Sequence, residues 1–167
     1  MNFEQIKPYN ISNGTGIRVS LFVTGCSHGC KGCFNREIWS KNAGKPFKNE
    51  DKSRILQLLA PACVTGLTLL GGDPMMPYNA PELTLLVKEV KELYPGKDVW
   101  VYSGFAYEQI MKDPVKKELL VHCDVLVDGK FEQELYSPLL RFRGSSNQRI
   151  IDIKKSLQAG RVELLIE

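Results

Sequence analysis

Short apolar segments alternate with amphipathic segments along most of this chain, and this alternation limits the folds it can adopt. In the clearest amphipathic segment, 81–94, apolar side chains recur at helical spacing. Pro81 suits the first turn of this helix, and Pro95-Gly96 ends it. A second helix is predicted at 50–60, and a later helical stretch is interrupted at Asp113-Pro114. Six apolar segments are predicted strands: 17–23, 65–70, 98–102, 124–127, 149–153 and 162–166.

Strand–helix–strand order of this kind predicts right-handed crossovers and a mainly parallel sheet. The strands are too few for a closed eight-stranded barrel, so we expect an α/β fold with a partial (open) parallel β/α barrel. A chain of 167 residues, 43% of them hydrophobic, can bury one core of good size. Residues 1–167 are therefore predicted to form a single domain.

Polar or glycine-rich turns follow four of the predicted strands. In parallel α/β folds, binding sites form where the carboxyl ends of the strands meet. All the candidate chemistry is therefore expected at one edge of the sheet. The four turns are Gly25-Cys26, Gly71-Gly72-Asp73, Ser103-Gly104 and Asp128-Gly129-Lys130.

Three cysteines, Cys26, Cys30 and Cys33, lie within eight residues. Soft thiolates select zinc, copper(I) or iron–sulfur clusters, and three from one loop leave one coordination position free. His28 could complete a zinc site, but it is wedged between two of the cysteines and no second ligand pair follows. A [4Fe–4S] cluster is normally held by four cysteines, so three would leave one iron open to a small ligand.

The remaining features restrict the class of protein. Cys63 follows a predicted helix and Cys123 opens an apolar run, so both are expected to be small core residues. A net charge of +3 without a basic stripe predicts no nucleic-acid partner. Residues 1–10 do not resemble a signal peptide, and Val64 to Leu70 is too short to span a membrane. We therefore expect a cytoplasmic protein with reduced cysteines, which favours metal binding or catalysis.

Cysteines separated by three and then two residues resemble the cluster motif of the radical S-adenosylmethionine (radical SAM) enzymes. This resemblance implies that Cys26, Cys30 and Cys33 bind a [4Fe–4S] cluster. It also implies that the fourth iron chelates S-adenosylmethionine, which is cleaved reductively to a 5′-deoxyadenosyl radical. The expected barrel is then of the radical SAM type.

A narrower resemblance covers nearly the whole chain and points to the anaerobic ribonucleotide reductase activating proteins. It implies that the chain generates a glycyl radical on the large subunit of anaerobic ribonucleoside-triphosphate reductase. It also implies a low-potential electron donor such as flavodoxin, and a homodimer or a heterotetramer with the reductase. The motifs that carry it are 13–18 (NGTGIR), 25–35, 71–74 (GGDP), 124–131 (DVLVDGKF) and 143–148 (RGSSNQ).

The glycine pair Gly71 and Gly72 has a physical rationale as a cofactor site. Two glycines at a strand end allow a ligand to approach the backbone, whose carbonyls can accept hydrogen bonds from the methionine ammonium. Asp73 adds a favourable negative charge. The alternative is an ordinary strand-to-helix turn. The superfamily more often has Glu at the position of Asp73.

The other site residues follow from the resemblance. Gly32, Cys33 and Phe34 would meet the adenine, although Gly32 stands where the superfamily usually has an aromatic residue. Ser103 and Asp128 resemble positions that touch the ribose or methionine of the cofactor, and Lys130 could pair with the methionine carboxylate. For these three, simple turn chemistry is the alternative.

Two other functions remain open from the residues alone. One is activation of another glycyl-radical enzyme, such as pyruvate formate-lyase; the short chain and residues 143–148 favour the reductase instead. The other is a non-catalytic iron–sulfur or zinc module, which explains the cysteines but leaves the remaining strand-end motifs as coincidence.

Overall fold

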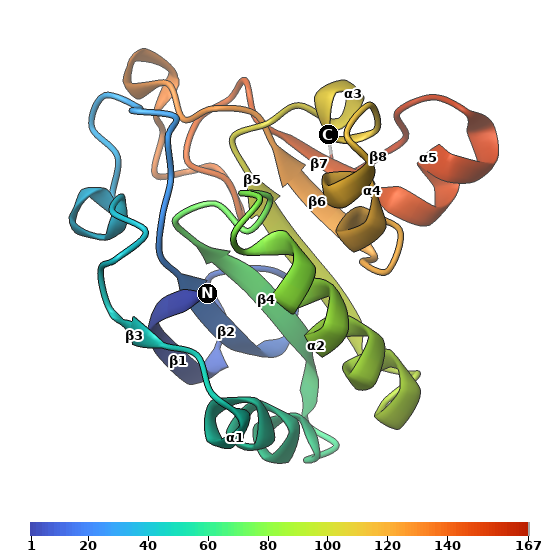
Figure 1. The fold of residues 1–167 in the computed structure, drawn as a ribbon. Helices are drawn as coiled ribbons and strands as arrows, with labels where there is room; N and C mark the ends of the chain where they lie inside the picture. The colour runs from blue at the N-terminus through green and yellow to red at the C-terminus, as the bar shows by residue number, and fades with distance from the viewer. Residues whose placement is uncertain (167) are drawn as a thin grey trace.

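The computed structural model describes residues 1–166, which contain one sheet in the order β3-β1-β2-β4-β5-β6-β7-β8 (Figure 1). Within these residues β3 and β8 form the two edges and do not pair with each other, so the sheet is open. The α/β class is confirmed, and the curvature of a partial barrel stays a prediction. The strands are β1 Asn2–Asn10, β2 Ile17–Val23, β3 Lys45–Pro46, β4 Val64–Gly71, β5 Asp98–Ser103, β6 Val125–Asp128, β7 Arg149–Asp152 and β8 Leu164–Ile166.

The centre of the sheet is parallel and its flanks are antiparallel, so the prediction of a mainly parallel sheet holds only for the four central strands. Strands β2, β4, β5 and β6 run parallel, with Leu21 opposite Leu69 and Leu69 opposite Val101. Strand β1 pairs antiparallel with β2, and β7 pairs antiparallel with β6. Strand β1 was not predicted because only Phe3 and Ile6 of its nine residues are buried, which leaves a mostly polar sequence.

Five α-helices connect or flank the strands of residues 1–166. Two of the predicted helices are confirmed to within a residue at each end, and the break at Asp113-Pro114 is where α4 begins. There Asp113 accepts hydrogen bonds from the backbone N–H groups of Val115 and Lys116, an N-cap that starts a new helix. Helix α5 was not predicted. The helices are α1 Asn49–Leu59, α2 Ala80–Leu93, α3 Tyr107–Ile110, α4 Pro114–Leu120 and α5 Ile153–Ala159.

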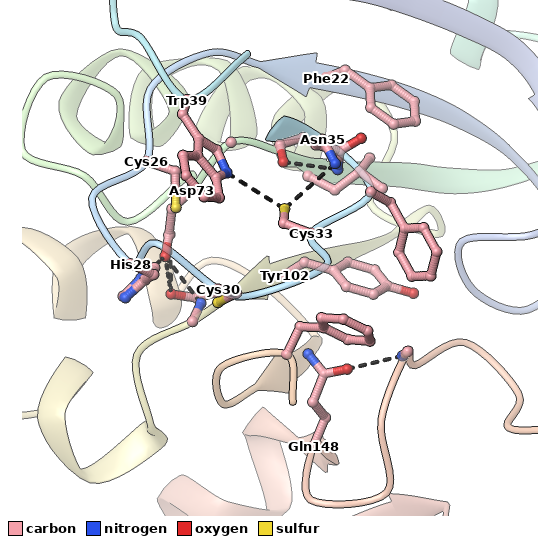
Figure 2. A pocket seen from close by; sticks show the side chains of 18 of the residues that line it. Phe22, Cys26, His28, Cys30, Cys33, Asn35, Trp39, Asp73, Tyr102 and Gln148 are labelled. Atoms are coloured by element: carbon pink, nitrogen blue, oxygen red, sulfur yellow. Dashed lines mark hydrogen bonds and ion pairs between the residues drawn. The ribbon is translucent and has the colours of Figure 1, made fainter. Parts of the chain in front are cut away.

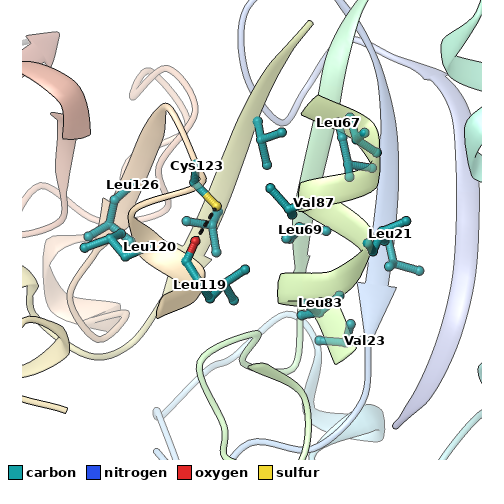
Figure 3. Close-up of a cluster of buried hydrophobic side chains, with 14 of the residues drawn as sticks. Leu21, Val23, Leu67, Leu69, Leu83, Val87, Leu119, Leu120, Cys123 and Leu126 are labelled. Atoms are coloured by element: carbon teal, nitrogen blue, oxygen red, sulfur yellow. Dashed lines mark hydrogen bonds between the residues drawn. The ribbon is translucent and has the colours of Figure 1, made fainter. Parts of the chain in front are cut away.

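The main core lies between the helices and one face of the sheet. Figure 3 shows Leu83 and Val87 of α2 directed at Leu21 and Leu69 of the central strands, and all four are buried. Cys123 is 1% exposed in this core, as predicted. The prediction for Cys63 was wrong. Cys63 is exposed because it lies in the surface turn between α1 and β4.

A second, smaller cluster covers the opposite face of the sheet. Trp100, Val127 and Ile150 are buried there, and Phe142 packs on them from the segment between β6 and β7. The Tyr102 hydroxyl donates to the carbonyl of Phe142 at 2.8 Å, which ties this segment to β5. Hydrophobic clusters therefore cover both faces of β5 and β6. In the described part of the chain, no helix is long and apolar enough to cross a membrane.

Candidate functional site

A cavity of about 320 Å³ lies at the carboxyl ends of the central parallel strands. The cysteine loop closes one side of it, and the segments that follow β4, β5 and β6 also line it (Figure 2). The sequence prediction that these turns share one edge of the sheet is therefore confirmed. From the predicted site the cavity receives Cys26, Cys30, Cys33, Phe34, Gly71, Gly72, Asp73 and Ser103.

The three cysteines are free thiols, and each is half-buried in the cavity wall. Burial raises the pKa of Cys26 to about 11 and also raises the pKa of Cys30. The backbone N–H of Phe131 and the charge of Lys130 oppose the rise at Cys30. Cys26 is thus protonated at neutral pH, and a metal centre must displace this proton to bind the thiolate.

The residues present fit an iron–sulfur cluster by the chemistry of their donors. Three thiols from one loop face one cavity, and two N–H groups already point at the Cys33 sulfur. Among residues 1–166, no three His, Cys, Asp or Glu side chains are close enough to hold one metal ion. The fit therefore rests on the thiol set and its N–H donors rather than on a preformed ion site.

His28 is turned towards Asp73 and is held there. Its Nε2 lies 2.6 Å from Asp73 Oδ2, its side chain is 7% exposed, and its ring packs edge-on against Phe105 at 4.5 Å. This contact engages Nε2 and leaves only Nδ1 of the ring available to a metal. It also ties the cysteine loop to the end of β4.

Asp73 connects three segments of the site. It is 1% exposed and accepts hydrogen bonds from the backbone N–H of Met75 at 2.8 Å and of Gly104 at 3.0 Å. The Ser103 hydroxyl lies 3.0 Å from each of its carboxylate oxygens. Together with His28, these contacts occupy both oxygens. Asp73 therefore holds these segments of the cavity wall together, and its carboxylate is buried within the wall.

The two glycines of the GGDP motif are required by the neighbouring backbone. A Cβ at Gly72 would lie 2.5 Å from the carbonyl oxygen of Gly25, and a Cβ at Gly71 would lie 2.6 Å from that of Val23. Gly71 also has φ +108°, a conformation that L side chains rarely adopt. The close approach that these glycines permit is thus between the end of β4 and the start of the cysteine loop.

Asp128 and Lys130 lie outside the cavity wall. Asp128 is 1% exposed, accepts from the backbone N–H of Tyr107 at 2.7 Å and forms an ion pair with Arg149. Lys130 is exposed. Between them Gly129 lines the cavity, so this turn reaches the site through its backbone.

An aromatic cluster stands at the rim of the cavity beside the third cysteine. Phe34 is 65% exposed, and its ring lies 5.3 Å from Phe131 and 5.7 Å from Tyr136. Gly32 is not among the residues that line the cavity. Its Cα faces the side chain of Gln133. Phe34, rather than position 32, therefore places an exposed aromatic ring beside the cysteine motif.

Known proteins resemble both the cysteine site and the whole chain. Residues 12–151 match the family described as a 4Fe-4S single cluster domain. The chain is 45% identical over 152 residues to an anaerobic ribonucleoside-triphosphate reductase-activating protein of Pasteurella multocida, and this match covers 90% of the chain and 96% of the relative. The proteins of the same name from phage T4 and Escherichia coli K12 are 42% and 41% identical, over 90% and 89% of the chain and 93% and 96% of their own lengths.

The chain belongs to the family of anaerobic ribonucleoside-triphosphate reductase-activating proteins. The family resemblance drawn from the five motifs is therefore confirmed. The match to a 4Fe-4S domain supports the iron–sulfur interpretation of the three cysteines and gives no support to the zinc module.

The cavity also contains residues that the sequence did not single out. Phe22 and Tyr102 line it from β2 and β5, and Trp39 lines it from the turn after the cysteine loop. The alternation of β5 was a usable signal for Tyr102, because Val99 and Val101 face the helices and Trp100 and Tyr102 face the other side. Trp39 lies outside any periodic segment, so no pattern indicated its position.

Proposed function

We propose that this protein is a radical SAM activase. In this proposal it cleaves S-adenosylmethionine reductively at a [4Fe–4S] cluster and generates a glycyl radical on anaerobic ribonucleoside-triphosphate reductase. The observation that carries the proposal is the meeting of Cys26, Cys30 and Cys33 with the GGDP turn in one cavity. The names of relatives that are 41–45% identical along the chain support the choice of target.

Three thiolates determine what the site can do with a cluster. Cys26, Cys30 and Cys33 would hold three of its irons, and no fourth cysteine follows at ligand spacing. A bound cluster, reduced by an external donor, would pass one electron to the sulfonium of S-adenosylmethionine, whose C5′–S bond would break to give methionine and a 5′-deoxyadenosyl radical able to take a hydrogen atom from the target. The protein's part is to bind, orient and exclude water.

The GGDP turn suits the methionine end of S-adenosylmethionine. The carbonyl of Gly71 accepts a hydrogen bond from Asn35 at 2.9 Å, which leaves the carbonyl of Gly72 for the methionine ammonium. The buried carboxylate of Asp73 favours that positive charge. We propose that Ser103 acts on the cofactor indirectly, by holding Asp73 in place, because its hydroxyl donates to the Asp73 carboxylate.

The rest of the cofactor would extend towards the rim. In the proposal the backbone of Gly32 to Phe34 meets the adenine, and the exposed Phe34 ring is the aromatic surface available to it. The positive charge of Lys130 acts to lower the pKa of Cys30, and we propose that Lys130 pairs with the methionine carboxylate. Asp128 acts from behind the wall by fixing the start of the turn that contains Gly129.

The target is proposed to complete the site. A radical step must exclude water, and the exposed Phe34 and Tyr136 leave an apolar rim for a glycine-bearing loop of the reductase large subunit. A low-potential donor such as flavodoxin would supply the electron. We place the protein in the cytoplasm as one domain, either as a homodimer or as a heterotetramer with the reductase.

The proposal is tested on anaerobically purified protein reconstituted with iron and sulfide. S-adenosylmethionine and a strong reductant are added, with and without the reductase large subunit, and 5′-deoxyadenosine is quantified. We expect 5′-deoxyadenosine, and a glycyl-radical EPR signal when the reductase is present. A fully loaded protein that yields neither, even with the reductase bound, would be an electron carrier instead.

Single cysteine variants locate the chemistry. We expect Cys26→Ala, Cys30→Ala and Cys33→Ala each to abolish 5′-deoxyadenosine formation, because each removes one of three ligands. Cys63→Ala is the matched control: Cys63 is exposed in a surface turn, and its loss should leave the yield unchanged. Full yield in any of the first three variants contradicts the assignment.

A further inference from the structure

Trp39 joins the two ends of the cysteine loop. Its indole Nε1–H donates a hydrogen bond to the Cys33 sulfur at 3.4 Å, as Figure 2 shows. Its backbone carbonyl accepts from the N–H of Cys26 at 2.9 Å. One residue, six positions beyond the last cysteine, therefore contacts both the first and the third.

The surrounding contacts fix the position of this indole. The 3-10 helix η1, Arg36–Ile38, precedes Trp39, and Ile38 is 3% exposed. The N–H of Gly25 donates to the Ile38 carbonyl at 2.8 Å, and the Arg36 guanidinium lies 5.8 Å from the centre of the Trp39 ring. Trp39 is thus held at three points: its carbonyl by Cys26, its ring face by Arg36 and its N–H by Cys33.

The donors are concentrated on one cysteine. Cys33 receives the indole N–H of Trp39 and, at 3.4 Å, the backbone N–H of Asn35. An indole N–H can only donate, so its one hydrogen points at sulfur whether that sulfur is a thiol or a metal-bound thiolate. Hydrogen bonds to the sulfurs of an iron–sulfur cluster are among the factors that determine its reduction potential.

We propose that Trp39 is a positioning residue that raises the reduction potential of the cluster through its N–H bond to Cys33. The inference rests on the proposed cluster at the three cysteines. When the cluster is reduced, an external low-potential donor loses one electron and the cluster gains it, while no covalent bond at Trp39 changes. An N–H directed at a ligand sulfur stabilises the more negative, reduced state more than the oxidised state. Trp39 thereby widens the range of donors able to reduce this cluster.

The test is a redox titration of reconstituted Trp39→Phe against the wild type, followed by EPR. Phe keeps an aromatic ring but removes the donor. We expect a lower midpoint potential, up to about tenfold in the equilibrium constant for one-electron reduction, which corresponds to about 59 mV. Tyr9→Phe is the matched control, because it removes one polar hydrogen from an exposed aromatic ring of β1 that does not line the cavity, and its potential should equal that of the wild type.

The outcomes separate this inference from the proposed function. Wild-type protein that binds no iron and sulfide contradicts the proposed function itself. A loaded Trp39→Phe protein with the wild-type potential overturns only the role of Trp39. EPR reports the potential of the loaded fraction alone, so a variant that loads incompletely still gives a decisive value.

Discussion

The two ends of the parallel strands both bury charge, but they use it differently. At the amino end, the guanidinium of Arg18 is fully buried and pairs with Asp98 at 2.7 Å. It also donates to Thr68 at 2.7 Å and to the carbonyl of Leu67 at 2.8 Å, and it lies 5.4 Å from the centre of the Trp100 ring. Every contact of this group is made within the fold, and its position serves stability.

At the carboxyl end, the buried group is a carboxylate that holds a loop. Asp73 receives donors from the strand ends and from His28 of the cysteine loop, and it stands directly behind a cavity. Burial of charge alone therefore does not indicate a functional site. The functional end is the one where the buried group positions residues that still face open space.

Removing the buried cation should give the largest loss of stability. We expect Arg18→Met to lower the free energy of unfolding of the cluster-free protein by about 3 kcal/mol, because it leaves buried acceptors without donors and Asp98 without its partner. Urea unfolding measures this change. Arg161→Met is the control, since Arg161 is 80% exposed and should contribute within about 0.5 kcal/mol. Equal stability of the two variants contradicts the structural role of the amino end.

A methyl group at the carboxyl end should have an intermediate effect on stability and a larger effect on the site. In Gly72→Ala the new Cβ would meet the Gly25 backbone at 2.5 Å, which forces the strand end and the cysteine loop apart. We expect a loss of about 1–3 kcal/mol and lower iron content after reconstitution. Gly96→Ala is the control, because nothing lies within 4 Å of its Cβ position. If Gly72→Ala loads iron like the control, the close approach is not needed.

An exposed ion pair at the carboxyl end should show the smallest effect, through pH. The hydrogen bond from Arg149 lowers the pKa of Glu108 below its ordinary value of 4.5. A lowered folded-state pKa adds stability above the unfolded-state pKa, and this stability is lost as pH falls through the folded-state value. Because Glu108 is 55% exposed, we expect only a few tenths of a kcal/mol.

The measurement for this pair is the free energy of unfolding at pH 7 and at pH 3. The wild type should lose slightly more stability on acidification than Glu108→Gln, in which the titrating group is absent. A variant that loses as much stability as the wild type shows that ionisation of Glu108 adds no pH-dependent stability.

Regular periodicity made much of the fold predictable. The apolar repeat of 81–94 and the turn residues around it located α2 to within a residue. Strand β1 escaped prediction because, beside β2 and the two-residue β3, it buries only two side chains. Helix α5 escaped because its seven residues directly follow β7 without a turn between them. Short elements whose burial depends on tertiary neighbours carry no periodic signal of their own.

The site was predictable to the extent that its residues lie at strand ends. Cysteine spacing and the glycine pair placed Cys26 and Gly72 at the correct edge of the sheet. The hydrogen bonds of Asp73 with His28 and Ser103 could not be predicted from the sequence, because these three residues come from separate segments. The contact of Trp39 with Cys33 likewise depends on how the loop closes.

We propose that the carboxyl edge binds a [4Fe–4S] cluster through three cysteines and leaves one iron open to S-adenosylmethionine. The most direct test is the EPR spectrum of the reduced, reconstituted protein before and after S-adenosylmethionine is added. We expect a cluster signal that changes on addition, because the ligand binds the open iron. A cluster signal that S-adenosylmethionine leaves unchanged would contradict it.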